Sequence, residues 1–171
     1  MGMRVLLSRK RWVAATVGVV VIGTLAAVAF GSPPSSFSFE NLVTGNSNND
    51  VKFNSDRVKF QTKDPTYVRV QRIVIGVGGN SGWHHHPGIV IGTVASGAVT
   101  FTKSDCSFTT YGPGLPAGAV FVEGGDDPGQ ASNAGGVPAT LYATFVAPNN
   151  GPITPTSMTF RIEDDPVVCT G

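Results

Sequence analysis

Short runs of β-branched and aromatic residues, separated by clusters of Gly, Pro, Asn and Ser, constrain the fold of this chain most strongly. Val, Ile, Thr, Phe and Tyr favour strands, whereas the intervening residues favour turns. With 22 glycines and 12 prolines, no stretch after residue 30 sustains a helical period. We therefore predict an all-β domain built as a sandwich or barrel. Strands are expected over residues 38–43, 57–61, 67–77, 89–94, 98–102, 119–122, 140–146 and 157–162.

The first 30 residues have the layout of an export segment. Four basic residues within the first 11 precede the uncharged run 12–30, and Gly-Ser-Pro-Pro follows. Ala27-Val28-Ala29 fits a cleavage site that would leave Phe30 as the new N-terminus. A helix over residues 12–30 is also long enough to cross a hydrocarbon layer of about 30 Å, so an uncleaved signal anchor is the alternative. Either way, we expect the rest of the chain to be secreted or anchored on the outer side of the membrane.

The chain beyond this segment is interpreted as a linker over residues 31–38 and one domain over residues 39–171. After residue 11 there are eight Lys and Arg residues against 11 Asp and Glu residues, a net charge of −3. No basic run follows residue 11. Because nucleic acids are bound through clustered cations, we expect no nucleic-acid partner.

Cys106 and Cys169 are the two cysteines of the chain, and both lie in the part expected to be exported. Two cysteines in an oxidising compartment usually pair, so we predict a disulfide between them. Such a loop would stabilise the fold by about 4 kcal/mol on the chain-entropy model. Metal ligation is the alternative, but there is no Cys-x-x-Cys and no histidine near either residue.

All three histidines stand in one run, His84-His85-His86, directly before a predicted strand. Because strand side chains alternate between faces, His84 and His86 share one face and His85 points to the other. Two imidazoles on one face can share zinc, copper, iron or nickel. His84 and His86 are therefore candidate metal ligands, and the alternative is that they are hydrogen-bonded polar residues in a ligand pocket or barrel mouth. We predict a surface position for His85.

The stretch from residue 67 to residue 171 holds two groups of spaced residues. The first is Gly78, His84-x-His86 and Gly97, and the second is Pro116-Ala117-Gly118 and Asn133-Ala134-Gly135. They resemble the two motifs of the cupin superfamily, and in particular small secreted actinobacterial cupins. The first motif is Gly, five residues, His-x-His, three or four residues, Glu, six residues, Gly, and the second begins Pro-x-Gly and ends His-x-x-x-Asn-x-Gly. The resemblance implies a double-stranded β-helix, or jelly-roll, barrel, and a homodimer paired through strands.

Two metal ligands of the family pattern are absent from this chain. The glutamate position falls on Val90 or Ile91, and the second-motif histidine falls on Phe121, or on Gly129 if residues 123–129 are a loop insertion. A third ligand could come from residues 123–130, where Glu123 is the carboxylate to single out because it follows the predicted strand 119–122, although its simplest interpretation is a surface residue. The other candidates are Asp126, Asp127 and Gln130, although Asp126 and Asp127 are most simply solvated loop residues.

Three functions are compatible with this interpretation. In the first, the protein binds a small molecule or carbohydrate at the cell surface, with a partly degenerate metal site and with Trp83 and Phe121 in the pocket. In the second, it is an enzyme of the oxygenase or isomerase type that uses iron, manganese or zinc at His84 and His86. A structural role with a filled barrel is a third. The acidic run Glu163-Asp164-Asp165 is expected to be solvated.

Overall fold

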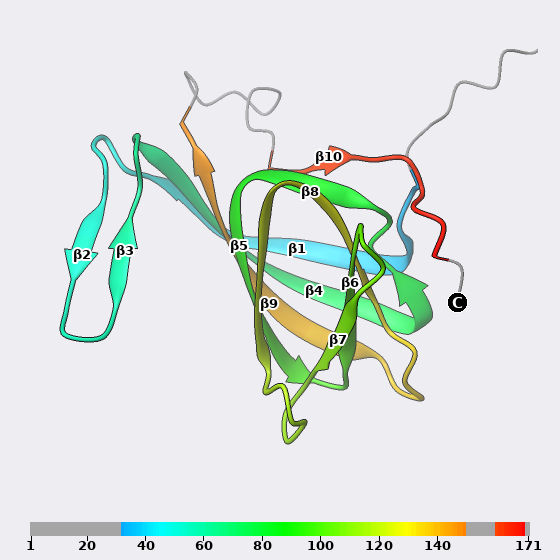
Figure 1. Cartoon of the computed structure of the whole chain (residues 1–171). Coiled ribbons are helices and arrows are strands. Elements are labelled where there is room, and N and C mark those ends of the chain that lie inside the picture. Colours follow the sequence, from blue (N-terminus) through cyan, green and yellow to red (C-terminus); the bar gives the residue numbers. More distant parts are fainter. Residues whose placement is uncertain (1–31, 150–159, 170–171) are drawn as a thin grey trace, which may run out of the picture.

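The computed structural model describes residues 32–149 and 160–169, and every regular element among them is a β-strand (Figure 1). The all-β class predicted from the sequence is confirmed. No helix in these two ranges is long and apolar enough to cross a membrane. The strands are β1 (Ser35–Asn46), β2 (Lys52–Asn54), β3 (Lys59–Gln61), β4 (Thr66–Asn80), β5 (His84–Ser96), β6 (Val99–Lys103), β7 (Phe108–Tyr111), β8 (Val120–Ser132), β9 (Ala139–Pro148) and β10 (Ile162–Glu163).

The main sheet curls into a barrel. Its strand order is β1-β4-β9-β5-β8-β6-β7, and β10 adds to the start of β5. Strands β4 and β8, which are separated in this order, also meet at Asn80 and Ser132. That contact completes a ring of β4, β9, β5 and β8, visible in Figure 1 as the strands that wrap around one interior. The barrel implied by the resemblance is therefore present.

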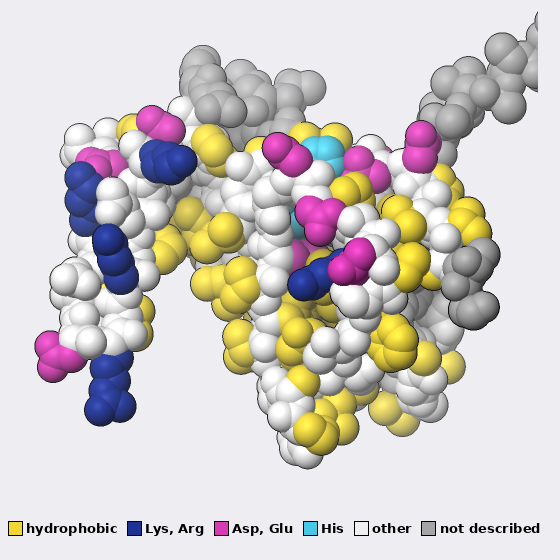
Figure 2. Space-filling model, in the orientation of Figure 1, with side chains coloured by type: hydrophobic (Ala, Val, Ile, Leu, Met, Phe, Trp, Pro, Cys, Tyr) yellow, Lys and Arg dark blue, Asp and Glu magenta, His cyan; other side chains and the backbone are white. Residues whose placement is uncertain are grey.

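The N-terminal part differs from the expected linker. Strand β1 begins at Ser35 and runs antiparallel along β4 to Asn46, so residues 35–38 are strand and not connector. Beyond β1, the β2–β3 hairpin projects away from the barrel (Figure 1) and carries Lys and Arg side chains along its surface (Figure 2). The sequence predicted a strand over residues 57–61 but missed β2, because three residues are too few for a visible alternation.

The segment 123–130 is also strand, which corrects the expected loop. Strand β8 continues from Val120 to Ser132 and pairs with β5 through two register shifts. Gly124 and Gly125 make this continuation feasible, because their φ angles of 137° and 79° are strained for any residue with a side chain. The glycines and aspartates that suggested a loop instead mark bulges in a strand.

The barrel core consists of aliphatic and aromatic side chains that alternate along β4, β5, β8 and β9. Ile75, Val90 and Val99 are among the side chains with almost no exposed surface. Each fully buried aliphatic side chain contributes about 1.5–3 kcal/mol, so this cluster is the main source of stability. The predicted disulfide is present between Cys106 and Cys169 and ties the β6–β7 turn to the C-terminal segment. The predicted N-terminal helix over residues 12–30 and residues 157–159 of the last predicted strand lie outside the described residues.

Asn133, which matched the end of the second sequence motif, has a structural role. Its side chain is 1% exposed. Its Nδ2 donates hydrogen bonds to the carbonyl oxygens of Ile75 and Val137, each at 2.9 Å, and its Oδ1 accepts one from the Gly135 amide at 2.9 Å. The residue therefore ties the β8–β9 turn to β4, far from the histidines in sequence.

We expect Asn133→Ala to lower the free energy of unfolding by about 2–4 kcal/mol, because it leaves buried backbone groups without partners. Urea denaturation measures this change. Asn49→Ala is the matched control, since Asn49 is exposed and its substitution should change stability by less than about 0.5 kcal/mol. Equal stability of the two variants would contradict the assigned role of Asn133.

Candidate metal centre

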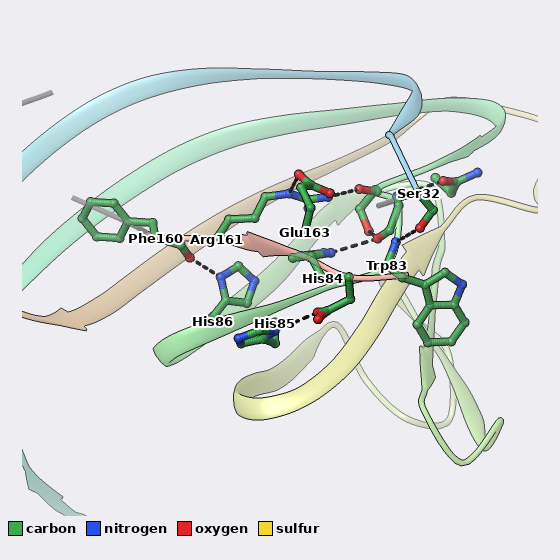
Figure 3. Close-up of polar contacts among 12 residues, drawn as sticks. Ser32, Trp83, His84, His85, His86, Phe160, Arg161 and Glu163 are labelled. Atoms are coloured by element: carbon green, nitrogen blue, oxygen red, sulfur yellow. Dashed lines mark hydrogen bonds and ion pairs between the residues drawn. The ribbon is translucent and has the colours of Figure 1, made fainter. Parts of the chain in front are cut away.

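His84 and His86 point into the barrel, as the strand alternation predicted. Their side chains are 5% and 4% exposed, and their ring centroids are 4.8 Å apart. His85 lies on the other face of β5, where its Nδ1 is 2.8 Å from Asp164 Oδ2 (Figure 3). The separation of His85 from the pair is confirmed, but His85 is half-buried in an ion-pair contact and is not a free surface residue.

Close strand packing places the histidines. Strand β5 shifts register against β8 between His84 and His86, and again between His86 and Ile89. Gly88 lies against the backbone of Val146 on β9, and a Cβ atom there would overlap the Val146 carbonyl oxygen. The His-Pro-Gly sequence therefore supplies both the bulge and the close approach that turn the two imidazoles inward.

Both buried histidines are held in the same tautomer. His84 Nδ1 is 2.9 Å from the Gly82 carbonyl oxygen, and His86 Nδ1 contacts the Phe160 carbonyl oxygen (Figure 3). A carbonyl oxygen only accepts, so each Nδ1 carries the proton and donates it. Each Nε2 consequently presents a lone pair to the interior. This arrangement, with the remote nitrogen anchored to the backbone, is the usual support of a metal-ligating histidine.

Glu123 completes a group of three. It stands on β8 directly opposite Val90 in the strand register, and its Oε1 lies 3.6 Å from His86 Nε2. The ligand atoms of His84, His86 and Glu123 all lie within 4.8 Å of one another. Val90 and Ile91, the two positions onto which the expected motif glutamate falls, are apolar, and the carboxylate comes from the register partner of Val90 on the neighbouring strand.

The other carboxylate candidates for a third ligand, Asp126 and Asp127, do not join this group, and Gln130 does not line the cavity around it. Asp126 and Asp127 are exposed, and Asp127 contacts the Ser104 hydroxyl. Among the residues that the structure describes, the site group contains only His84, His86 and Glu123. The sequence-based preference for Glu123 therefore agrees with the geometry.

The residues fit a divalent transition metal. Two imidazole nitrogens and one carboxylate are ligands that iron, manganese and zinc accept. His86 Nε2 is buried and has no hydrogen-bond partner among the described residues. An unsatisfied buried nitrogen costs about 1–3 kcal/mol, and a bound cation would remove that cost.

The electrostatic environment of His84 favours the uncharged imidazole. The pKa of His84 is lowered from 6.5 to about 4, mainly by burial and also by the positive charge of Arg161, while the Glu123 carboxylate acts in the opposite direction. At neutral pH the imidazole is therefore uncharged, the form that binds metals.

The group lies in a cavity of about 810 Å³ inside the barrel. Its walls include Phe121, as expected, and the apolar side chains Ile75 and Leu141. Trp83, the other aromatic residue expected in the pocket, is buried at 6% exposure but does not line the cavity. Because Trp83 precedes the inward-facing His84, the alternation of the chain turns it away from the interior.

The C-terminal segment forms part of the site, which the sequence did not indicate. Strand β10 pairs with His84 and His85 and brings the Phe160 carbonyl to His86. Arg161 lines the cavity and is held by Glu163, with Nε–Oε1 at 2.5 Å and NH2–Oε2 at 2.8 Å (Figure 3). The expected solvated acidic run is confirmed for Glu163 and Asp165, which are exposed, but Asp164 is half-buried against His85 Nδ1. The contacts of this C-terminal segment with the site depend on the pairing of β10 with β5, which the sequence pattern does not indicate.

We expect the metal-free protein to lose stability as the pH falls from 6.5 towards 4. The folded-state pKa of His84 lies below its unfolded value, so the unfolded state takes up the proton first and is favoured in this window. The loss attributable to His84 is about 3 kcal/mol once the pH is below 4. Urea denaturation of chelator-treated protein at pH 7 and pH 4.5 measures it.

The control for this experiment is His84→Gln, whose stability should change less over the same pH interval because the titrating group is absent. NMR titration of the His84 imidazole provides a second readout. A pKa near 6.5 in the folded protein would contradict the expected effect.

No family model matches the sequence, and no curated protein matches it. Solved structures with a similar fold include the polyketide cyclase RemF from Streptomyces resistomycificus, with 10% identity and a TM-score of 0.46 over 67% of each chain. A cupin 2 conserved barrel domain protein from Salinispora arenicola has 15% identity and a TM-score of 0.44, over 66% of this chain and 76% of that one. The SPY1581 protein of unknown function from Streptococcus pyogenes also has 15% identity and a TM-score of 0.44, over 67% and 76%. Likenesses at this level say nothing about activity.

Proposed function

We propose that this chain is a cupin whose barrel binds one divalent transition metal through His84, His86 and Glu123 and acts on a small organic molecule in the adjoining cavity. The observation that carries the proposal is the convergence of the three ligand atoms within 4.8 Å. The buried, unpartnered Nε2 of His86 and the anchored Nδ1 atoms of both histidines support it. Because Glu123 lies beside the two histidines as a third potential ligand, we favour a metal-dependent enzyme over a binding protein with a partly degenerate metal site, the function that the sequence favoured.

The ligand set suggests the class of chemistry. Two histidines and one carboxylate occupy one side of a metal and leave positions for water, oxygen or substrate, as in non-haem iron oxygenases. When bound, the metal would supply Lewis acidity or oxygen chemistry. The residues of the chain would orient the metal ligands and limit access of water to them. The backbone carbonyl contacts fix the two imidazoles, and the apolar side chains of Phe121 and Leu141 line the cavity. An oxygenase or isomerase type of reaction is the proposal that follows.

A small-molecule binding protein is the second candidate function. A cavity of about 810 Å³ with a mainly apolar base and a few polar groups is of the size and character of small-molecule sites. In this alternative the metal centre would hold a ligand without transforming it. The two candidates share the site and differ in whether the bound molecule is changed, which product analysis after incubation distinguishes.

We expect the purified protein, prepared without an affinity tag, to contain about one iron, manganese or zinc ion per chain by mass spectrometry. His84→Ala/His86→Ala should abolish the retained metal. Glu123→Gln should lower the metal affinity by at least about 100-fold. Loss of a residue that only hydrogen-bonds to a metal ligand already lowers the affinity about 10- to 100-fold, and loss of a ligand itself should have a larger effect.

The matched control is His85→Gln, which removes a neighbouring imidazole that points away from the site and should leave the metal content unchanged. Metal that is unchanged in the double variant, or far below one equivalent in the wild type, would overturn the proposed function. A normal thermal unfolding midpoint in each variant is the required check on folding.

We further propose that residues 1–30 export the protein to an oxidising compartment, where it is secreted or stays anchored to the membrane. The basic head and the apolar run 12–30 support this proposal. The Cys106–Cys169 disulfide supports it too, because such bonds persist outside the reducing cytoplasm.

Thiol alkylation in intact bacterial host cells tests the export proposal. In the full chain, we expect both cysteines to be protected from alkylation until a reductant is added. In a variant that lacks residues 1–30, retained in the cytoplasm, both should react directly. Free thiols in the full chain would contradict export.

A further inference from the structure

One guanidinium in the cavity has no acidic partner. Arg69 lines the cavity, donates from Nε to Thr44 Oγ1 at 3.1 Å, and lies 4.2 Å from the centroid of the Phe160 ring. Within residues 32–149 and 160–169 no carboxylate forms an ion pair with it, whereas Arg161 is paired with Glu163. Because arginine stays protonated in proteins, Arg69 places an uncompensated positive charge at the cavity wall.

Strand register places Arg69 in the same layer of the barrel as the candidate metal centre. Arg69 on β4 is opposite Phe145 on β9, Phe145 is opposite Val90 on β5, and Val90 is opposite Glu123 on β8. Three strand spacings amount to about 14 Å along the sheet, and the curl of the barrel shortens the direct path. Since Arg69 and Glu123 both line the cavity, they face its interior from two sides.

The layers below this one become progressively apolar. The next row holds Gln71, Ala143, Gly92 and Phe121, and the one below holds Ile73, Leu141 and Val94. Gln71 is fixed by a 2.8 Å hydrogen bond from its Nε2 to Asn41 Oδ1. A ligand that fills the cavity therefore meets a charged and metal-binding layer at one end and hydrocarbon at the other.

We propose that the ligand of this site is a monocarboxylic acid with an apolar tail, and that Arg69 binds its carboxylate. The tail lies over Phe121, Leu141 and Ile73, and the atoms next to the carboxylate face His84, His86 and Glu123. This assignment deepens the proposed function and rests on it for the part that faces the metal.

The charge balance of the layer selects the carboxylate. Arg69 contributes a positive charge that forms no ion pair with a carboxylate among the described residues, so this wall of the cavity favours an anionic ligand group over a cationic one. Glu123 also lines the cavity, and its carboxylate disfavours an ion with two negative charges, such as inorganic phosphate at neutral pH, whereas the charge of Glu163 is offset by Arg161. A guanidinium fork matches the geometry of a carboxylate, which it binds through two parallel hydrogen bonds.

Binding of 3-phenylpropanoate and its neutral amide, 3-phenylpropanamide, to the purified metal-loaded protein tests this proposal by calorimetry. The two probes share shape and tail and differ in charge. We expect the acid to bind about 10- to 100-fold more tightly, the range of a hydrogen bond to a charged group. Arg69→Gln should abolish this preference while the affinity for the amide stays the same, and Arg69→Lys should retain part of it.

The matched control is Arg72→Gln. Arg72 is exposed on the outer face of the same strand, so its loss should leave the preference for the acid intact. Equal affinities of the wild type for acid and amide would overturn the proposal without any variant. A preference that survives Arg69→Gln would also overturn it, by showing that the metal alone selects the carboxylate. Metal content is measured in parallel: metal without acid preference refutes only this inference, and absence of metal refutes the proposed function.

Discussion

The antiparallel pairing of β5 with its neighbours is the constraint on which the candidate site depends. Strand β5 is hydrogen-bonded to β9 and to β8, and β10 joins its first residues. These ladders determine which side chains face inward, because a slip of one residue would exchange the two faces. With the observed register, His84 and His86 enter the barrel and His85 meets Asp164 outside it. The two bulges next to the histidines are the local adjustment that lets a polar pair replace core residues at one end of an otherwise apolar strand.

Burying polar groups in this barrel has a cost that the structure only partly offsets. The two Nδ1 atoms are satisfied by backbone carbonyls, one from the turn before β5 and one from the C-terminal segment. His86 Nε2 remains without a partner among the described residues. A barrel selected for stability alone would have apolar side chains here. The unsatisfied nitrogen, the adjacent carboxylate and Arg69, which forms no ion pair within residues 32–149 and 160–169, all lie around one cavity. This arrangement is consistent with a site built for a cation and an anionic ligand.

Sequence reasoning succeeded where chemistry and alternation are local. The all-β class, the inward histidine pair, the disulfide and the choice of Glu123 all agree with the structure. It failed for residues 123–130, because glycine and aspartate predict turns and also occur in bulged strands. It failed again for Asp164, which is half-buried against His85 because β10 pairs with β5. Trp83 was misplaced because an aromatic residue next to two histidines suggests a pocket, whereas alternation turns it away.

The sequence by itself determined the class of fold and the most reactive residues, because β-propensity, turn chemistry and the period of two are properties of short segments. Only the tertiary structure decided that the carboxylate opposite Val90 joins the histidines, that the Phe160 carbonyl orients His86, and that Arg69 shares a layer with Glu123. Each of these relations joins strands that are distant along the chain. Their register depends on the closure of the whole barrel, and no local pattern encodes it.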